Sequence, residues 1–340
     1  MRRVMERLFE KESLSETEAC QVMNAMMAGE LSDEEISGIL SILRFRGESV
    51  DEMTGFAKAM RDHSMKITHR KPDLVDTCGT GGDGTGTFNI STAAALLVSA
   101  AGTPVAKHGN RSVSSKTGSA DVLEELGVPV QSNQQEASDL LERYNLCFMF
   151  APVYHSSMKH VAKARKSLGV KTVFNLLGPL TNPAGTTKQL IGVYDRHAAV
   201  KMAETARRLG TEHALFVTGE DGLDELTITG KTYVTELKNH QITSYTMTPE
   251  EAGVRRGALK DITVNRKEES AALIREVLEN RAPDAAREIV LLNAGAALYA
   301  AGKADSIKHG VKEARDTLNS GAGAAKLEQL TEEDERRVLA

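Results

Sequence analysis

The stretch DTCGTGGDGTGTFNIST, from Asp76 to Thr92, holds five glycines and five threonines in seventeen positions. Glycine lets a ligand approach the backbone closely and permits positive φ angles. A loop between a strand and a helix can point consecutive backbone N–H groups at an anion, and the positive end of the helix dipole adds to the attraction. The pattern predicts a strand around 74–77 and a helix that begins near Ser91. We therefore interpret this segment as a phosphate-binding loop.

The glycines of GTGGDG (79–84) also fit the Gly-x-Gly-x-x-Gly fingerprint of dinucleotide-binding proteins. A Rossmann unit places an acidic residue at the end of its second strand, where the acid binds a ribose. The second predicted strand, in TPVAKHGNRS, ends instead with Lys107, His108 and Arg111. These residues argue against a nicotinamide dinucleotide and for a ligand with phosphate at both ends. The Walker pattern is absent too, because no lysine follows the last glycine of the loop.

A second polar segment, KHGNRSVSSKTGSAD (107–121), begins at the end of that strand. It adds an amide and five hydroxyl groups to the basic side chains: Asn110, Ser112, Ser114, Ser115, Thr117 and Ser119. Taken alone, the segment also fits a solvated polar loop. Parallel strands bring their carboxyl ends to one edge of a sheet, so we expect both segments to meet there. Together they predict a cup for phosphate groups.

Two adjacent acids, Asp224 and Glu225, lie in GEDGLDELT after the predicted strand HALFVTG. Adjacent carboxylates are commonly no more than exposed surface charges. Mg²⁺, however, binds through one or two carboxylates together with the phosphates of a substrate. Opposite a phosphate cup, we therefore interpret the pair as a Mg²⁺ site.

The composition excludes several classes of function. The 340 residues carry a net charge of −5, and there is no Trp and only 4% aromatics, so neither a basic field nor stacking platforms are available for nucleic acid. No apolar run reaches the length of a membrane span, and the amphipathic opening MRRVMERLFEKE contains acids, unlike a signal peptide. Three widely spaced cysteines, Cys20, Cys78 and Cys147, predict reduced thiols in a cytoplasmic protein.

The elements that must position these residues fall into two parts. Amphipathic helical patterns fill the chain before Pro72, one of them capped by Ser32. Short apolar runs then alternate with helical stretches, which predicts a mostly parallel sheet. The segment 225–249 alternates polar and apolar residues between turns at Gly230 and Asn239, as in an antiparallel meander. We predict an α/β fold: a small all-helical lobe, and a larger α/β lobe with a mostly parallel central sheet and an antiparallel extension.

Four segments together resemble the signature of anthranilate phosphoribosyltransferases: the glycine loop, KHGNRSVSSKTGSAD, NLLGPLTNP (175–183) and GLDEL (222–226). The similarity extends from the helical opening to LNAGAALY (292–299), so it covers essentially the whole chain. The second segment also resembles pyrimidine nucleoside phosphorylases. GTGGDG followed by NIST is the more specific part, because those phosphorylases usually depart from it there.

The resemblance implies binding residues at the matching positions. It places phosphoribosyl pyrophosphate on Gly79, Gly82, Asp83, Thr87, Asn89, Ile90, Ser91, Thr92, Lys107, His108, Gly109, Asn110, Arg111, Ser112, Val113, Ser114, Ser115 and Ser119. It places anthranilate on Gly79, His108, Asn110 and Arg165. It implies one or two Mg²⁺ ions on Ser91, Asp224 and Glu225.

The implied reaction transfers the phosphoribosyl group to the amine of anthranilate and releases pyrophosphate, a step of tryptophan biosynthesis. Lys107 and Arg111 would stabilise the charge of the leaving group. Arg165 offers a bidentate fork to the anthranilate carboxylate. His108 is a candidate acceptor for the amine proton, although a histidine in a phosphate loop is as often a neutral hydrogen-bond donor. We expect Lys107, His108 and Arg165 to be the catalytic residues.

The family fold further implies that 1–71 and 162–185 form the helical lobe, on the acceptor side of a cleft, and that two copies form a homodimer through it. The remainder, 72–161 and 186–340, would bind phosphoribosyl pyrophosphate. Two alternatives remain open. A pyrimidine nucleoside phosphorylase would use phosphate and need no acidic pair, and a non-catalytic phosphoribosyl or nucleic-acid binder should lack the carboxylates. We expect no nucleic-acid or membrane partner.

Overall fold

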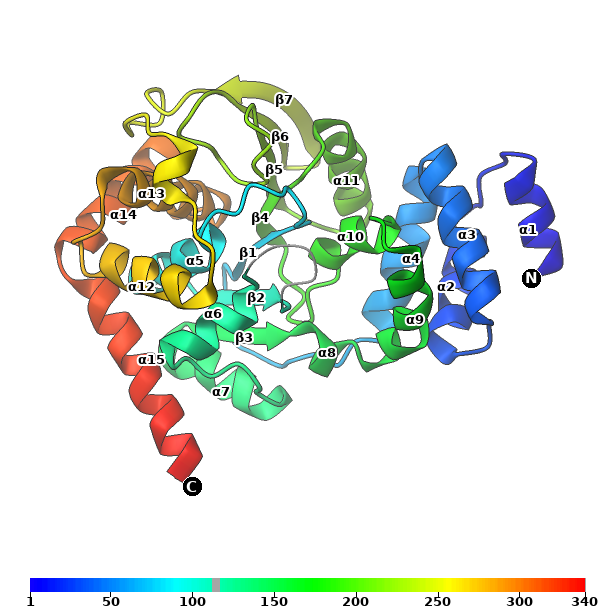
Figure 1. Ribbon diagram of the computed structural model, residues 1–340, viewed down its shortest axis with the longest axis horizontal. Helices are drawn as coiled ribbons and strands as arrows, with labels where there is room; N and C mark the ends of the chain where they lie inside the picture. Colours follow the sequence, from blue (N-terminus) through cyan, green and yellow to red (C-terminus); the bar gives the residue numbers. More distant parts are fainter. Residues whose placement is uncertain (112–116, 340) are drawn as a thin grey trace.

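The computed structural model describes residues 1–111 and 117–339. Figure 1 shows a group of helices at the N-terminal side of the molecule, next to a larger part built around a sheet. The N-terminal group contains α1 (Arg2–Phe9), α2 (Glu16–Ala28), α3 (Asp33–Arg46) and α4 (Val50–Asp62). The α/β fold class predicted from the sequence is confirmed.

The N-terminal helices begin where local side chains satisfy their first backbone N–H groups. Ser15, Ser32 and Ser49 each accept a hydrogen bond from the backbone three residues later, and the glutamate at that position bonds back to the serine N–H. The predicted cap at Ser32 is confirmed. The last of these glutamates, Glu52, also accepts from the backbone N–H of Leu14 at 2.9 Å, so one buried carboxylate caps α4 and holds the segment that leads into α2.

Within the described residues, seven strands form one sheet in the order β3-β2-β1-β4-β5-β6-β7. Their bounds are β1 (Val75–Gly79), β2 (Val105–Gly109), β3 (Leu146–Phe150), β4 (Lys188–Gly192), β5 (His213–Gly219), β6 (Thr232–Lys238) and β7 (Gln241–Met247). The strands from β3 to β5 are parallel, while β6 and β7 pair antiparallel. Strand β1 has β2 on one side and β4 on the other, so the strand order reverses at β1.

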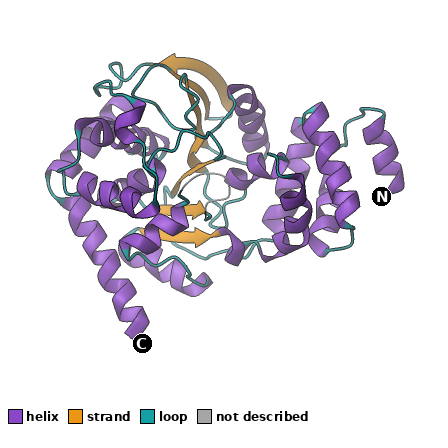
Figure 2. Ribbon diagram, viewed as in Figure 1, coloured by secondary structure: helices purple, strands orange, loops and turns teal. Residues whose placement is uncertain are grey.

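Helices cover both faces of the sheet, as Figure 2 shows. Alternate residues of a buried strand therefore enter different cores. In β5, Leu215 and Val217 pack into the larger hydrophobic cluster, whereas Ala214 and Phe216 pack into the cluster that contains the N-terminal helices. The helices after α4 are α5 (Ile90–Ala100), α6 (Ser119–Leu126), α7 (Gln134–Tyr144), α8 (Ala151–Tyr154), α9 (Lys159–Leu168), α10 (Val173–Leu177), α11 (Arg196–Arg208), α12 (Lys267–Leu278), α13 (Asp284–Ala300), α14 (Ile307–Asn319) and α15 (Ala322–Leu339).

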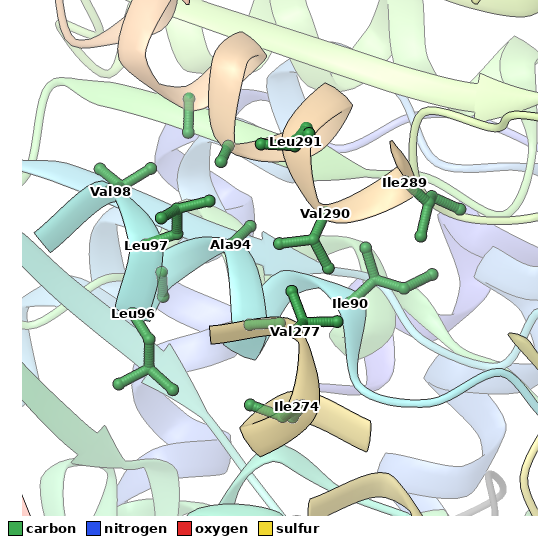
Figure 3. Close-up of a cluster of buried hydrophobic side chains, with 14 of the residues drawn as sticks. Ile90, Ala94, Leu96, Leu97, Val98, Ile274, Val277, Ile289, Val290 and Leu291 are labelled. Atoms are coloured by element: carbon green, nitrogen blue, oxygen red, sulfur yellow. The ribbon is translucent and has the colours of Figure 1, made fainter. Parts of the chain in front are cut away.

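The larger cluster is centred on α5, which begins directly after the glycine loop. In Figure 3, Ala94 and Leu97 of α5 lie against Val290 of α13, and Val277 of α12 closes the same core. Several of these residues are fully buried, including Ala94, Leu97 and Val290. Tight apolar packing on α5 therefore fixes the helix end that faces the proposed phosphate site.

The stretch after Val161 packs with the N-terminal helices. Val161 and Ala164 of α9 and Phe174 of α10 belong to the same hydrophobic cluster as Leu40 of α3. Figure 1 likewise shows α9 and α10 beside the N-terminal group of helices. The lobe boundaries predicted from the sequence remain a prediction.

The expected meander is wrong at its first strand. The antiparallel part consists of β6 and β7 paired onto β5, and 225–229 forms no strand. The backbone and side chains of that segment bond elsewhere: the hydroxyls of Thr227 and Thr229 donate to Asp221 at 2.7 and 2.6 Å. Apolar alternation alone cannot reveal such competing partners.

None of the helices in the described part of the chain is both long and apolar enough to cross a membrane.

Candidate active site

The glycine loop lies at the carboxyl end of β1, where the strand order of the sheet reverses. In open parallel sheets this switch point is the usual place for a ligand. The backbone N–H of Thr80 bonds to the carbonyl of Gly192 at 2.8 Å, and the Thr80 hydroxyl accepts from the N–H of Tyr194 at 3.1 Å. The loop is therefore tied to β4 as soon as it leaves β1.

Positive φ angles run through the loop and explain its composition. Gly81, Gly82, Gly84 and Gly86 have φ angles of 67°, 77°, 74° and 71°. Residues with a Cβ avoid this region, so other amino acids would strain the backbone here. The far end of the loop is held by Phe88, whose N–H bonds to the carbonyl of Ile262 at 3.0 Å.

The acidic pair contacts this loop through Asp224. Asp224 Oδ2 accepts the backbone N–H of Gly81 at 2.8 Å. The Glu225 carboxylate lies near the backbone of Ser91, in the first turn of α5, which partly opposes the rise of its pKa. The sequence predicted a common site for these acids and the loop, and the structure brings them together.

Burial raises the pKa values of both carboxyl groups of the acidic pair. Burial, and then the charge of Asp83, raise the pKa of Asp224 to about 7. Burial, and then the charge of Asp224, raise the pKa of Glu225. Carboxylates crowded together in a low-dielectric site favour a cation that neutralises both.

The donor set fits Mg²⁺. The Ser91 hydroxyl and the two carboxylates supply hard oxygen atoms, which Mg²⁺ prefers. Among the described residues, no group of three His, Cys, Asp or Glu side chains is placed to enclose a metal ion. Mg²⁺ usually completes its coordination with waters and with oxygen atoms of substrate phosphates.

Lys107 extends from β2 into the centre of the site. Its side chain is buried, and its ammonium group donates to the carbonyl of Thr77 and to the Ser91 hydroxyl at 3.2 Å. Burial lowers the pKa of Lys107, while the charges of Asp76 and Glu225 oppose that shift. The buried ammonium group thus links β1 to the start of α5.

Asp76 and Asn182 were not predicted as site residues. Asp76 is the second residue of β1 and is fully buried. Its carboxylate accepts from the backbone N–H of His108 at 3.2 Å and from Asn182 Nδ2 at 2.7 Å. This network joins β1, the predicted phosphate segment and NLLGPLTNP. In the sequence, an acid within a predicted buried strand was the signal that could have indicated this network.

His108 and His155 face each other next to this network. Their ring centroids are 5.1 Å apart, and both side chains are buried. Burial lowers the pKa of His108 to about 3 and that of His155 to about 4, so both rings are neutral near pH 7. Within the described part of the chain, neither Nε2 atom has a hydrogen-bond partner. Sequence analysis missed His155, since no local pattern brings it beside His108.

A pKa of about 3 makes His108 a weak base. Backbone carbonyls of NLLGPLTNP lie near the two rings and partly oppose the effect of burial on their pKa: Gly178 for His108 and Thr181 for His155. The role of His108 as proton acceptor stays a prediction.

Arg165 lies on α9 and is partly buried. Its guanidinium lies 5.0 Å from the ring centroid of Phe174, and burial lowers its pKa. In the described residues it forms no ion pair. A desolvated guanidinium without a carboxylate favours an anionic ligand.

Arg111 is held by acids rather than pointing freely into a cup. Its guanidinium pairs with Asp121 at 2.8 Å and with Glu124 at 2.5 Å, both on α6. These hydrogen bonds raise its pKa. The predicted residues Ser112, Val113, Ser114 and Ser115 lie outside the described residues. Ser119 donates from its hydroxyl to the carbonyl of Asn110 at 3.3 Å.

Comparison with known proteins agrees with this geometry. Residues 2–64 match the helical bundle domain, and residues 71–324 the a/b domain, of a glycosyl transferase family. The fold and the site therefore define a glycosyl transferase of this two-part class. The anthranilate phosphoribosyltransferase of Halalkalibacterium halodurans is 58% identical over 326 residues, which cover 96% of this chain and 95% of that protein. The chain belongs to the anthranilate phosphoribosyltransferase family.

Solved structures show the same similarity. The anthranilate phosphoribosyltransferase of Thermus thermophilus superposes with a TM-score of 0.91 at 42% identity, over 97% of this chain and 99% of that one. The enzyme of Saccharomyces cerevisiae, solved in complex with PRPP and Mg, superposes with a TM-score of 0.88 at 28% identity, over 98% and 97%. These relatives support the phosphoribosyltransferase interpretation and give no support to a nucleoside phosphorylase or a non-catalytic binder.

Proposed function

We propose that this chain transfers the phosphoribosyl group of phosphoribosyl pyrophosphate to the amine of anthranilate, giving N-(5-phosphoribosyl)anthranilate and pyrophosphate in tryptophan biosynthesis. The observation that carries the proposal is the contact between the glycine loop and the acidic pair, made through the backbone N–H of Gly81 and Asp224. The loop would bind an anion, and the nearby carboxylates would repel that anion unless a cation lies between them. A diphosphate with its divalent metal satisfies both.

The sugar substrate is proposed to lie along the loop and the first turn of α5. The residues proposed for it are Gly79, Gly82, Asp83, Thr87, Asn89, Ile90, Ser91 and Thr92, together with 107–115 and Ser119. Support comes from the positive φ angles of the loop's glycines and from the place of the loop directly before the N-terminus of α5. The pairing of Arg111 with Glu124 implies that this guanidinium exchanges partners when it binds phosphate.

Ser91, Asp224 and Glu225 are proposed to hold Mg²⁺, as one or two ions. The metal, when bound, would supply positive charge to the oxygen atoms of the leaving pyrophosphate. The buried ammonium of Lys107 adds a second positive charge next to Ser91 and would counter the charge that develops on the leaving group.

Anthranilate is proposed to bind near Gly79, His108 and Asn110, with its carboxylate on Arg165. The fork of the guanidinium would orient the ring, and hence the amine, toward the sugar. The arylamine attacks without prior deprotonation, so the site needs orientation more than a strong base. The neutral His108 and His155 rings suit this role because they can bond to a neutral ligand without repelling Arg165.

We further propose the lobe arrangement, the oligomer and the location. The segments 1–71 and 162–185 would form the helical lobe, which closes over the α/β lobe and excludes water. Phe9 of α1 and Phe45 of α3 expose 68% and 85% of their surface, which supports a homodimer through these helices. The cysteines are free thiols, which supports a cytoplasmic location.

The test is to mix the purified protein with Mg²⁺, anthranilate and phosphoribosyl pyrophosphate and to follow anthranilate fluorescence. We expect fluorescence to disappear only when all three are present. Release of a free base from a pyrimidine nucleoside and phosphate, with anthranilate untouched, would instead establish the phosphorylase activity and overturn the proposal.

A further inference from the structure

The acidic pair is carried by a segment that is neither helix nor strand. In 221–229 the apolar residues Leu223, Leu226 and Ile228 are fully buried in the larger hydrophobic cluster. Asp224, which lies between two of them in the chain, is left on the side of the glycine loop and accepts from Gly81. Because this segment lacks the hydrogen bonds of a helix or a strand, its backbone polar groups need other partners. The positions of those partners determine where Asp224 and Glu225 lie.

One of these partners is Asn293, in the middle of α13. Its Oδ1 accepts from the backbone N–H of Leu226 at 3.0 Å, and its Nδ2 donates to the carbonyl of the same residue at 3.0 Å. The second hydrogen of Nδ2 goes to the carbonyl of Ile289 at 2.9 Å. The side chain is 0% exposed. Asn293 thus bonds to both the N–H and the carbonyl of Leu226, the residue that follows Glu225.

The surroundings make this asparagine unusual. In Figure 3 its neighbours Ile289, Val290 and Leu291 on α13 are apolar and pack into the core around α5. Solvation alone would favour another apolar side chain at position 293, because burying an amide is unfavourable unless each polar group is paired. The amide makes two hydrogen bonds to Leu226, and these fix both the position and the orientation of the backbone at that residue.

A close backbone contact restrains the other side of the pair. A Cβ atom on Gly192 of β4 would lie 1.5 Å from the main-chain oxygen of Asp224, so β4 passes directly against this backbone. Asp221 holds the segment by accepting from the N–H of Leu223 at 3.2 Å. The acidic pair is therefore fixed from β4 on one side and from α13 on the other.

We propose that Asn293 is a positioning residue for the acidic pair: through Leu226 it sets the place from which Asp224 and Glu225 reach the metal that accompanies the diphosphate. The inference rests on the proposed function, which gives these carboxylates a metal to bind. It predicts that loss of the amide weakens metal-dependent binding, although Asn293 touches neither metal nor substrate.

The test measures the binding of pyrophosphate by calorimetry, with and without Mg²⁺, in wild type and in Asn293→Leu. For each protein, the Mg²⁺ factor is the ratio of the dissociation constant without Mg²⁺ to the one with Mg²⁺. This factor isolates what the metal contributes, because the phosphate cup binds pyrophosphate in both measurements. We expect Mg²⁺ to tighten binding to the wild type, and this factor to fall about tenfold or more in Asn293→Leu. Binding without Mg²⁺ should stay within about twofold of wild type, because the phosphate cup does not depend on the amide.

Leu291→Ala is the matched control. Leu291 is fully buried on the same helix, so the change weakens α13 packing without removing a bond to Leu226. We expect it to lower the melting temperature and to leave the Mg²⁺ factor unchanged. Should Asn293→Leu fail to fold, Asn293→Asp decides: it keeps the shape and an oxygen that accepts from Leu226, but even a protonated carboxyl has a single O–H and cannot donate to both carbonyls.

The outcomes separate the two hypotheses. If Mg²⁺ tightens binding equally in wild type and in the folded Asn293 variant, the inference is wrong and the proposed function stands. An equal loss in Leu291→Ala would also overturn it, because the effect would then be a general weakening of α13. If Mg²⁺ does not tighten binding to the wild type, the metal site itself is wrong, and the inference fails with it.

Discussion

The backbone N–H of Gly81 donates a 2.8 Å hydrogen bond to Asp224 Oδ2 and so joins two segments that are 143 residues apart in the chain. One partner belongs to the glycine loop after β1, and the other to the acidic pair after β5. The contact forms because both segments leave the carboxyl edge of the same sheet, on either side of β4. It brings a predicted phosphate site and a predicted metal site to one place.

Removing both carboxylates should abolish most of the activity. Asp224→Asn with Glu225→Gln keeps the shape of the pair but removes the negative charge that a divalent cation needs. We expect kcat/KM to fall about a hundredfold or more, with a weaker dependence on Mg²⁺. Glu220→Gln, an exposed acid close in sequence, is the control and should remain active. Full activity in the double variant would show that the pair does not hold the metal.

Changes at Arg165 should separate the two substrates. Arg165→Ala removes the fork proposed for the anthranilate carboxylate, so the KM for anthranilate should rise about tenfold to a hundredfold. The KM for phosphoribosyl pyrophosphate should change little. Lys166→Ala, an exposed change on the same helix, should behave like wild type. Equal increases for both substrates would move Arg165 out of the acceptor site.

Two glycines next to Asp224 should give opposite results. A Cβ on Gly79 would lie 2.9 Å from Asp224 Oδ2, which can rotate away, so Gly79→Val should raise the KM for phosphoribosyl pyrophosphate about tenfold or more and change the melting temperature by less than about 2 °C. A Cβ on Gly192 would lie 1.5 Å from the main-chain oxygen of Asp224. Gly192→Ala should therefore lower the melting temperature by roughly 5 °C or more. A destabilised Gly79→Val would mean that this glycine is structural.

The buried neutral rings of His108 and His155 should each make the protein less stable at acid pH. Their pKa values of about 3 and about 4 lie below the ordinary value of 6.5, so between these values the unfolded chain binds protons that the folded chain does not. The contribution of each histidine to the free energy of unfolding therefore decreases as pH falls from about 6.5 toward 4, by up to about 1.4 kcal/mol per pH unit. The raised pKa values of Asp224 and Glu225 act in the opposite direction, so the prediction concerns the difference between wild type and a variant that lacks one ring.

Urea unfolding at several pH values tests this expectation. His155→Gln should reduce the slope of unfolding free energy against pH by close to one proton between about pH 6 and pH 5. His309→Gln, in which an exposed histidine is lost, controls for the removal of an imidazole. An unchanged slope in His155→Gln would show that this ring does not stay neutral in the folded state.

The sequence alone was enough for features that depend on neighbouring residues. The serine cap at Ser32 is a local device within one helical turn. The glycine loop was evident because positive φ angles strongly favour glycine, and four glycines of the loop adopt them. Short apolar runs separated by helical stretches predicted the parallel sheet, and its geometry then required the loop and the acidic pair to share an edge.

Only the tertiary structure decided which distant side chains meet. His155 faces His108, Asn182 binds Asp76, and Asn293 holds Leu226, through segments with no local sign of the contact. The same kind of contact removed the expected strand at 225–229, because a helix amide and an aspartate took the place of a neighbouring strand. Local sequence sets the shape of each element, but the bonding partner of a buried polar group depends on what packing places beside it.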